Sequence, residues 1–240
     1  MRTLMWYISF AFTLIGTIPK LFKVNTLKNQ GKSIDCEDYI HKVTSKWALG
    51  AVKRTGTCVE VYGTQNLPQE QAVVFISNHQ GNFDIPILMS YVNKPKGFIA
   101  KIETQKIPVV RTWMRHIHCI FMDRSTLKGS AGAIIEGINT LKKGYSLVIF
   151  PEGTRSKSNQ MGEFKSASFK LATKAKVPII PISICGSYKI MEANHNQIKP
   201  AQVKLYIHEC IETKNLSKEQ IEQLPEQVYN IIKSKLPDSL

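Results

Sequence analysis

From Cys58 onward, short apolar runs rich in β-branched residues alternate with stretches of helical periodicity. This alternation is typical of α/β folds, in which helices cover a mostly parallel sheet. Several runs are apolar at every position, which is the pattern of strands buried on both faces. We therefore predict an α/β fold with a largely parallel β-sheet flanked by helices. The predicted strands are residues 59–62, 73–77, 98–100, 119–122, 147–150, 179–184 and 203–208.

Helices are predicted between these strands at residues 84–91, 127–141 and 165–174. Ser217 begins a last helix, because Gln220 completes a capping box with it and Leu216 and Ile221 can form a hydrophobic staple. No internal repeat and no long linker divides this part of the chain. Residues 55–240 are therefore predicted to form one domain.

The segment of residues 3–19 has no charged side chain, and as a helix it would be roughly 25 Å long, against ~30 Å for the hydrocarbon core of a bilayer. A cleaved signal peptide would need a small-residue cleavage site, where the sequence has Gly16-Thr17-Ile18-Pro19-Lys20. A transmembrane anchor is marginal in length. A helix that enters one leaflet, with Trp6 and Tyr7 near the headgroups, fits the length best.

A second helical pattern begins near Asp35, with Ile40, Val43 and Trp47 on its apolar face. Residues 1–54 contain nine Lys or Arg and three Asp or Glu, a net charge of +6 that would attract anionic lipid. We predict that residues 1–54 form a short membrane-associated helical pair. The alternative is that both helices pack on the domain as a soluble cap.

The whole chain of 240 residues has 32 Lys and Arg against 18 Asp and Glu, a formal charge of +14. This excess implies an anionic partner, such as nucleic acid, an acidic membrane surface, an acidic carrier or a phosphorylated substrate. The five cysteines show no CxxC spacing and several lie in apolar runs, so they are interpreted as buried thiols in a reducing compartment. No phosphate-loop motif, metal-ligand spacing or RNA-binding motif is found, so no metal or cofactor is predicted.

His79 and Asp84 directly follow the predicted strand 73–77. On one continuous helix they would point about 140° apart, so they can meet only if residues 80–82 form a turn, which Gly81 and Asn82 permit. A carboxylate bound to one ring nitrogen holds a histidine in one tautomer and makes it more basic, as a general base requires. The alternative is that Asp84 only caps the following helix.

Two further polar clusters follow predicted strands, at the sheet edge where α/β proteins place their sites. Residues 150–156 (FPEGTRS) contain Gly153, which lets backbone N–H groups approach a ligand, and Arg155, whose planar fork suits phosphate. Residues 120–124 (IFMDR) end in Asp123 and Arg124. Lys101 and Glu103 end another strand and form a possible ion pair. Each cluster alone is compatible with a solvated surface turn.

Together these blocks resemble the lysophosphatidic acid acyltransferase (1-acyl-glycerol-3-phosphate O-acyltransferase) family of the glycerolipid acyltransferases. The resemblance rests on Asn78-His79 with Asp84, on Lys101 and Glu103, and on the segments 120–124, 150–156 and 177–182 (VPIIPI), which occur in the family's order. It covers about residues 60 to 185. The chain departs from the family at His118 and Ala167, where the family usually has Gly.

The resemblance implies an enzyme that acylates the sn-2 hydroxyl of 1-acyl-glycerol-3-phosphate and gives phosphatidic acid in phospholipid biosynthesis. His79 is then the general base and Asp84 orients it. Arg124 and Arg155 hold the acceptor phosphate, and Glu152 bonds a glycerol hydroxyl or steadies an arginine. Gly153 and Thr154 line the same loop, and backbone N–H groups near Gly81 or Gly153 are candidates to stabilise the oxyanion.

The implied partners are acyl-CoA or acyl-carrier protein, lysophosphatidic acid and an anionic membrane surface, with no cofactor and no metal. The implied location is the membrane, with the catalytic domain of residues 55–240 facing the cytoplasm. The alternative within the enzymes is another acceptor, either glycerol-3-phosphate or another lysolipid. The alternative outside them is a basic nucleic-acid-binding protein, which the apolar segment of residues 3–19 disfavours.

Overall fold

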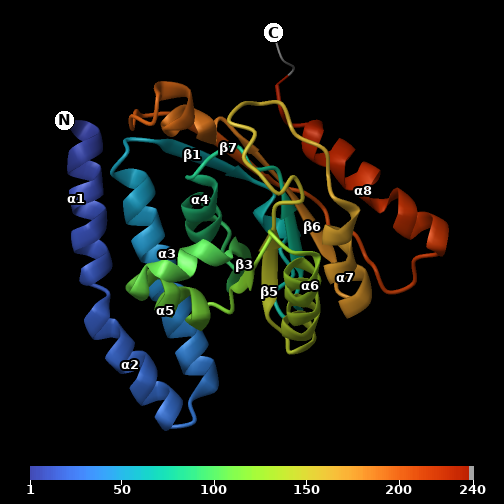
Figure 1. The fold of residues 1–240 in the computed structure, drawn as a ribbon, viewed down its shortest axis with the longest axis horizontal. Coiled ribbons are helices and arrows are strands. Elements are labelled where there is room, and N and C mark those ends of the chain that lie inside the picture. Colours follow the sequence, from blue (N-terminus) through green and yellow to red (C-terminus); the bar gives the residue numbers. More distant parts are fainter. Residues whose placement is uncertain (238–240) are drawn as a thin grey trace.

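The structure is a computed structural model that describes residues 1–237, and its centre is a seven-stranded sheet (Figure 1). The spatial order is β1-β7-β6-β2-β5-β3-β4, and every neighbouring pair is parallel except β6 with β7. All seven predicted strands are confirmed within two residues at each end. Their bounds are β1 Cys58–Tyr62, β2 Val74–Ser77, β3 Lys96–Lys101, β4 Ile120–Met122, β5 Ser146–Ile149, β6 Ile179–Cys185 and β7 Gln202–Ile207.

The helices agree with the sequence in part. Helices α4 (Asp84–Tyr91) and α6 (Leu127–Lys142) match the predicted ranges, and α8 (Lys218–Lys233) starts with the predicted capping box at Ser217. The predicted helix at residues 165–174 is wrong in its first turn, because a 3₁₀ helix precedes α7 (Lys170–Ala175). Helix α5 (Pro108–His116) was not predicted, although proline is favoured in a first helical turn.

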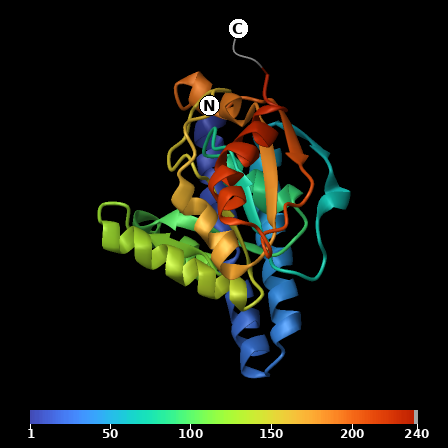
Figure 2. The ribbon, with the colours of Figure 1, turned by 90° about the vertical axis from the view of Figure 1, so that its right-hand side faces the viewer.

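Helices cover both faces of the sheet (Figures 1 and 2). Phe75 of β2 is buried in a cluster that includes residues of α4, whereas its neighbours Val74 and Ile76 are buried in a cluster with residues of α6, α7 and α8. Successive side chains of a strand point to opposite faces, so a strand covered on both sides must be apolar throughout. Each such buried side chain stabilises the fold by about 1.5–3 kcal/mol.

The N-terminal part consists of α1 (Arg2–Ile15), α2 (Ile18–Asn29) and α3 (Ser33–Lys53). Helices α1 and α2 follow one another with only a short break, and together they run beside α3 (Figure 1). On α1, the Trp6 indole N–H donates to the Ala51 carbonyl of α3 at 2.9 Å, and Phe10 packs on Trp47. The predicted helical pair is thus confirmed, but its first helix ends at Ile15 instead of residue 19, and α2, which was not predicted, follows it before α3.

The opposite face of α1 is exposed and apolar, and Phe22 of α2 continues it. Met5, Phe12 and Phe22 are 68%, 72% and 70% exposed. The stretch Arg2–Asn29 has the length and composition of a helix that can cross a membrane. A soluble cap would bury its apolar side chains, so the exposed face agrees better with the predicted association with a lipid surface.

Candidate active site

His79 and Asp84 meet at the carboxyl end of β2. The His79 Nδ1 atom lies 2.7 Å from Asp84 Oδ2, and the Asp84 side chain is fully buried. The turn that the sequence predicted brings them together, because residues 81–83 form a bend and a turn directly before α4 begins at Asp84. The same carboxylate also accepts the Gly81 N–H at 2.8 Å and the hydroxyl of Ser187. Three donors therefore fix the Asp84 side chain in one orientation.

Asp84 binds the Nδ1 atom of His79, so Nε2 is the ring nitrogen that is available for proton transfer. Because Nδ1 faces a carboxylate, it carries the ring proton, and the lone pair is on Nε2. The ring stacks on Phe150 with 4.0 Å between centroids, and the side chain lines a large cavity. A histidine held in this tautomer and position is able to accept a proton from a molecule in the cavity.

Glu152 joins the His79 loop to the loop that follows β5. Its Oε1 accepts the His79 backbone N–H at 2.6 Å, and its Oε2 accepts the Gly162 N–H at 2.8 Å. The Ser156 N–H donates back to the His79 carbonyl. Burial raises the pKa of the Glu152 carboxyl, and the two backbone N–H donors partly offset that effect. Glu152 therefore contacts backbone rather than an arginine, and it does not line the cavity.

Arg124 and Arg155 lie at the same cavity as His79. Arg124 donates to the Gly153 carbonyl, and Arg155 donates to the Asn82 side chain. Of the residues to which the resemblance assigns a role in the reaction, the structure brings His79, Arg124, Gly153, Thr154 and Arg155 to this one cavity, with Asp84 and Glu152 behind them. The sheet topology accounts for this convergence, since β2, β4 and β5 are parallel and end at the same edge.

The glycine N–H groups that the sequence suggested as oxyanion donors have other partners. The Gly81 N–H donates to Asp84, and the Gly153 N–H donates to the Phe150 carbonyl at 3.1 Å. Gly153 instead serves the turn itself, because its φ of 71° lies in the left-handed region that favours glycine.

The cavity has a volume of about 800 Å³ and reaches from the arginines to the space between the helices and the sheet. Its walls are mainly apolar, and α1 and α3 contribute to them. Trp6, Phe10, Leu14 and Trp47 of these helices line the same cavity as His79. The N-terminal helices thus form one wall of the candidate active site.

Two residues of the site, Ser187 and Glu192, were not predicted from the sequence. The side chain of Glu192 is 2% exposed, accepts the Asn82 N–H at 2.8 Å, and lies 3.6 Å from Arg155. No local motif marks it. Ser187, which donates to Asp84, follows the end of β6, so the rule that sites gather at strand ends could have found it.

The other residues that the sequence singled out have simpler roles. Lys101 and Glu103 form an exposed ion pair of 3.0 Å, and Lys101 also lines the cavity of His79. Asp123 accepts two hydrogen bonds from Ser125, which lower the pKa of its carboxyl. His118 has a φ of 58°, which accounts for the glycine usual at that position in the family that the sequence resembles. Within residues 1–237, no group of three His, Cys, Asp or Glu side chains is placed to hold a metal ion.

Fold and site together define a class of protein: an α/β sheet with a His–Asp pair at the carboxyl ends of its strands, beside an apolar cavity that two arginines also line. Comparison with known sequences identifies the family. The family model "Acyltransferase" matches residues 58–185, which is more than half of the chain. The chain therefore belongs to the Acyltransferase family.

Individual relatives agree with this assignment. The chain is 39% identical over 158 residues to a probable 1-acyl-sn-glycerol-3-phosphate acyltransferase of Mycoplasma pneumoniae, an alignment that covers 62% of this chain and 57% of that protein. It is 34% identical to the chloroplastic 1-acyl-sn-glycerol-3-phosphate acyltransferase BAT2 of Brassica napus, over 63% of this chain and 44% of the relative. The chain thus spans about half the length of these two relatives.

A solved structure is similar over nearly the full length. The crystal structure of the 1-acyl-sn-glycerophosphate (LPA) acyltransferase PlsC from Thermotoga maritima has a TM-score of 0.83 and 30% identity, and the match covers 98% of this chain and 95% of that one. The likeness therefore includes the N-terminal helices as well as the sheet.

Proposed function

We propose that this protein transfers a fatty acyl group from a thioester, acyl-CoA or acyl-carrier protein, to the sn-2 hydroxyl of 1-acyl-glycerol-3-phosphate and releases phosphatidic acid. The observation that carries the proposal is the position of His79, whose Nδ1 is held by Asp84 and whose side chain lines an apolar cavity of about 800 Å³ together with two arginines. The names of the relatives support this acceptor.

In this mechanism the acceptor hydroxyl attacks the donor directly. His79 Nε2 removes the hydroxyl proton as the oxygen attacks the thioester carbonyl, and the tetrahedral intermediate collapses with release of the thiolate. The imidazolium returns its proton to that thiolate, so proton and charge balance. Asp84 stabilises the imidazolium because its buried carboxylate lies 2.7 Å from Nδ1. General base catalysis of this kind contributes about 10²–10⁴ in rate.

Arg124 and Arg155 are proposed to bind the acceptor phosphate, with Gly153 and Thr154 lining the loop beside it. Each guanidinium has five N–H donors in a planar fork. In the structure Arg124 donates to the Gly153 carbonyl, and Arg155 donates to the Asn82 side chain and lies 3.6 Å from the Glu192 carboxylate. These contacts orient the guanidinium groups and leave further N–H donors for phosphate. We assign Glu152 to holding the two loops together, since its oxygens bind backbone N–H groups.

The apolar part of the cavity is proposed to hold an acyl chain. Aromatic and aliphatic side chains from α1, α3, α4, α5 and the sheet line it. Each CH₂ group that leaves water for such a site contributes about 0.8 kcal/mol, so a chain of many carbons binds firmly without polar contacts. The length of the apolar part of the cavity fixes the position of the reacting carbonyl relative to His79. This positioning is a large part of the catalytic effect.

The exposed apolar face of α1 and α2 is proposed to lie in the membrane, with the remainder of the domain on the cytoplasmic side. Phe12 and Phe22 would enter the lipid, while Lys20, Lys23 and Lys28 would meet anionic headgroups. This placement is supported by the cavity wall that α1 provides, because a lysolipid could pass from the leaflet to His79 along that helix.

The test is an acyl-transfer assay on membranes that contain the protein, with a panel of acceptors and with both donor types. We expect phosphatidic acid from 1-acyl-glycerol-3-phosphate, and little product from lysolipids that lack the terminal phosphate, since the arginines have no ligand there. Transfer to glycerol-3-phosphate in preference to the lysolipid would contradict the proposed acceptor. Absence of transfer to every acceptor with either donor would contradict the reaction class.

A further inference from the structure

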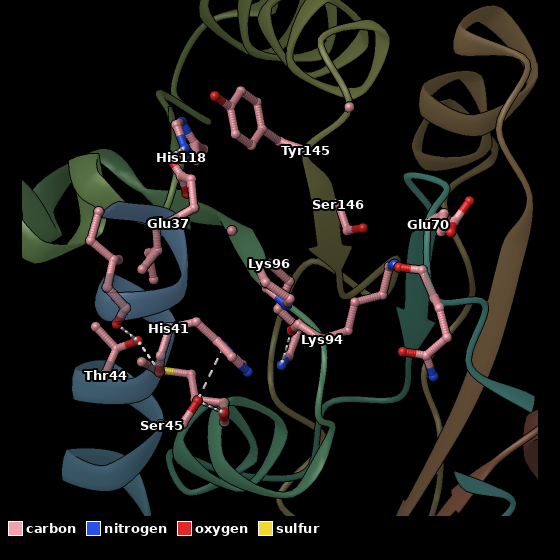
Figure 3. A pocket seen from close by; sticks show the side chains of 17 residues that line it. Glu37, His41, Thr44, Ser45, Glu70, Lys94, Lys96, His118, Tyr145 and Ser146 are labelled. Carbon is pink, nitrogen blue, oxygen red and sulfur yellow. Dashed lines mark hydrogen bonds and ion pairs between the residues drawn. The ribbon is translucent and has the colours of Figure 1, made fainter. Parts of the chain in front are cut away.

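A second cavity lies at the amino ends of β3 and β5 (Figure 3). It has a volume of about 180 Å³ and is lined by the first residues of β3 and β5, Lys96 and Ser146, and by residues of α3. Because β2, β3 and β5 are parallel, strands that end at the His79 site begin on this side. Of the polar residues that line this cavity, Thr44 alone also lines the cavity of His79, and the proposed acyl transfer gives none of them a chemical role.

Two lysines, Lys94 and Lys96, line the cavity and are each only 8% exposed. The Lys96 ammonium donates to the carbonyls of Val92 and Lys94 at 2.7 and 3.0 Å. The Lys94 ammonium donates to the carbonyls of Pro68 and Gln69 at 2.8 and 3.0 Å. An ammonium group has three N–H donors, and these contacts occupy two of them. One N–H of each lysine is therefore left for another acceptor.

The charges of the two lysines are not balanced by a carboxylate. Within residues 1–237, no Asp or Glu oxygen lies within 4.0 Å of either ammonium. The cavity has two acidic side chains, of which Glu37 pairs with His118 at 3.0 Å and Glu70 is exposed. Buried cations are ordinarily paired, because moving a lone charge out of water is costly.

The acid–base properties of Lys96 agree with a missing counter-ion. Burial, with a smaller effect from the charge of Lys94, lowers the pKa of Lys96 from 10.5 to about 7. Burial also lowers the pKa of His41, which lies on the α3 wall of the cavity. The other titratable groups that line the cavity are Glu37, Glu70, Lys94, His118 and Tyr145.

We propose that this cavity is a binding site for one small dianion of the phosphate type, held by the free N–H donors of Lys94 and Lys96, which line it. Lysine ammonium groups bind phosphate as point charges, and a dianion neutralises both cations at once. A volume of about 180 Å³ is below the ~300 Å³ of small-molecule pockets, which excludes a nucleotide but leaves room for phosphate.

The anion site shares part of its wall with the apolar cavity. Thr44, Met89 and Ile117 line both. An anion bound in this cavity therefore lies next to side chains that also border the proposed acyl-chain site. The anion site itself does not depend on the proposed reaction.

The test is calorimetric titration of inorganic phosphate at neutral pH into the full chain with Arg124→Ala and Arg155→Ala, so that the proposed acceptor site does not bind the probe. We expect saturable binding in this protein and in the same protein with Lys143→Met, which replaces an exposed lysine. Adding Lys96→Met instead should weaken binding by at least about tenfold, since a hydrogen bond to a charged group is lost. Absence of saturable binding, or equal affinity with Lys96→Met, would overturn the proposal.

A second measurement needs no substitution at Lys96. Sulfate keeps its charge of −2 across neutral pH, so the pH dependence of its affinity reports on the protein alone. With the pKa of Lys96 at about 7, sulfate affinity should fall steadily as pH rises above neutrality, by up to about tenfold for each pH unit. Lys94→Met should weaken sulfate binding as well. An affinity that does not change with pH and survives Lys94→Met would contradict the site.

Discussion

Replacement of Asp84 by asparagine separates the charge of this residue from its shape. Asp84 accepts hydrogen bonds from His79 and Gly81 on one oxygen and from Ser187 on the other. An asparagine can keep its oxygen toward His79 and Gly81 and turn its NH₂ group toward the Ser187 hydroxyl, which is able to accept. Asp84→Asn should therefore leave the turn intact and remove only the negative charge.

The expected loss in rate follows from the geometry of the pair. A hydrogen bond to a charged group contributes about 1.5–3 kcal/mol, which corresponds to about 10- to 100-fold in rate and sets the lower limit. Two unit charges 2.7 Å apart at an effective dielectric constant of about 20 interact by about 6 kcal/mol, which sets an upper limit near 10⁴-fold. We predict that kcat of Asp84→Asn falls by about 10²–10⁴.

The assay is acyl transfer to 1-acyl-glycerol-3-phosphate at saturating donor, with thermal unfolding measured on the same protein. The KM for the acceptor should change little, because Arg124 and Arg155 are unaltered. Asp84→Ala is the matched control for structure: it leaves the buried Gly81 N–H without a partner and should cost a further ~1–3 kcal/mol of stability. A folded Asp84→Asn protein with kcat within a few-fold of the unmodified protein would refute the reasoning.

Three further predictions address the phosphate site, the membrane face and the buried lysine. Arg155→Ala should raise the acceptor KM by about 10- to 100-fold and change the donor KM little in steady-state kinetics, since it removes charged hydrogen bonds to phosphate; equal effects on both would argue against this role. Phe12→Glu with Phe22→Glu should release the protein from anionic vesicles in a sedimentation assay, and undiminished pelleting would place the membrane contact elsewhere. The unfolded chain binds more protons than the folded one between the folded and unfolded pKa values of Lys96, so the free energy of unfolding should rise as pH increases from about 7 to about 10.5. Lys96→Met should reduce this rise in denaturant titrations, and an unchanged slope would contradict the lowered pKa.

The strands were predictable because burial on both faces leaves a plain sequence signal. Residues 74–76 are fully buried between two layers of helices, and every one is apolar. Helix α5 gave a weaker signal, since it is short and lies in the connection between β3 and β4. Its packing depends on distant residues such as Thr17, whose hydroxyl accepts the Trp113 indole N–H at 2.8 Å.

The site was predictable where its parts are close in the chain. Gly81 and Asn82 indicate the turn that brings His79 to Asp84, and these residues are local. Ser187 and Glu192 lie more than 100 positions from their partners in the first loop, and only the arrangement of the strands brings them there. The sequence also could not show that Glu152 binds backbone N–H groups, because nearly every residue type has a backbone N–H and the sequence does not indicate which of them lie near Glu152.

The most direct test of the proposed mechanism is the turnover number of His79→Ala, measured with a thioester donor and 1-acyl-glycerol-3-phosphate on membranes that hold equal amounts of folded protein. Removal of the only group proposed to accept the hydroxyl proton should lower kcat by at least about 10²-fold while the protein stays folded and membrane-bound. A His79→Ala protein that transfers acyl groups at the rate of the unmodified protein would show that another group accepts the proton.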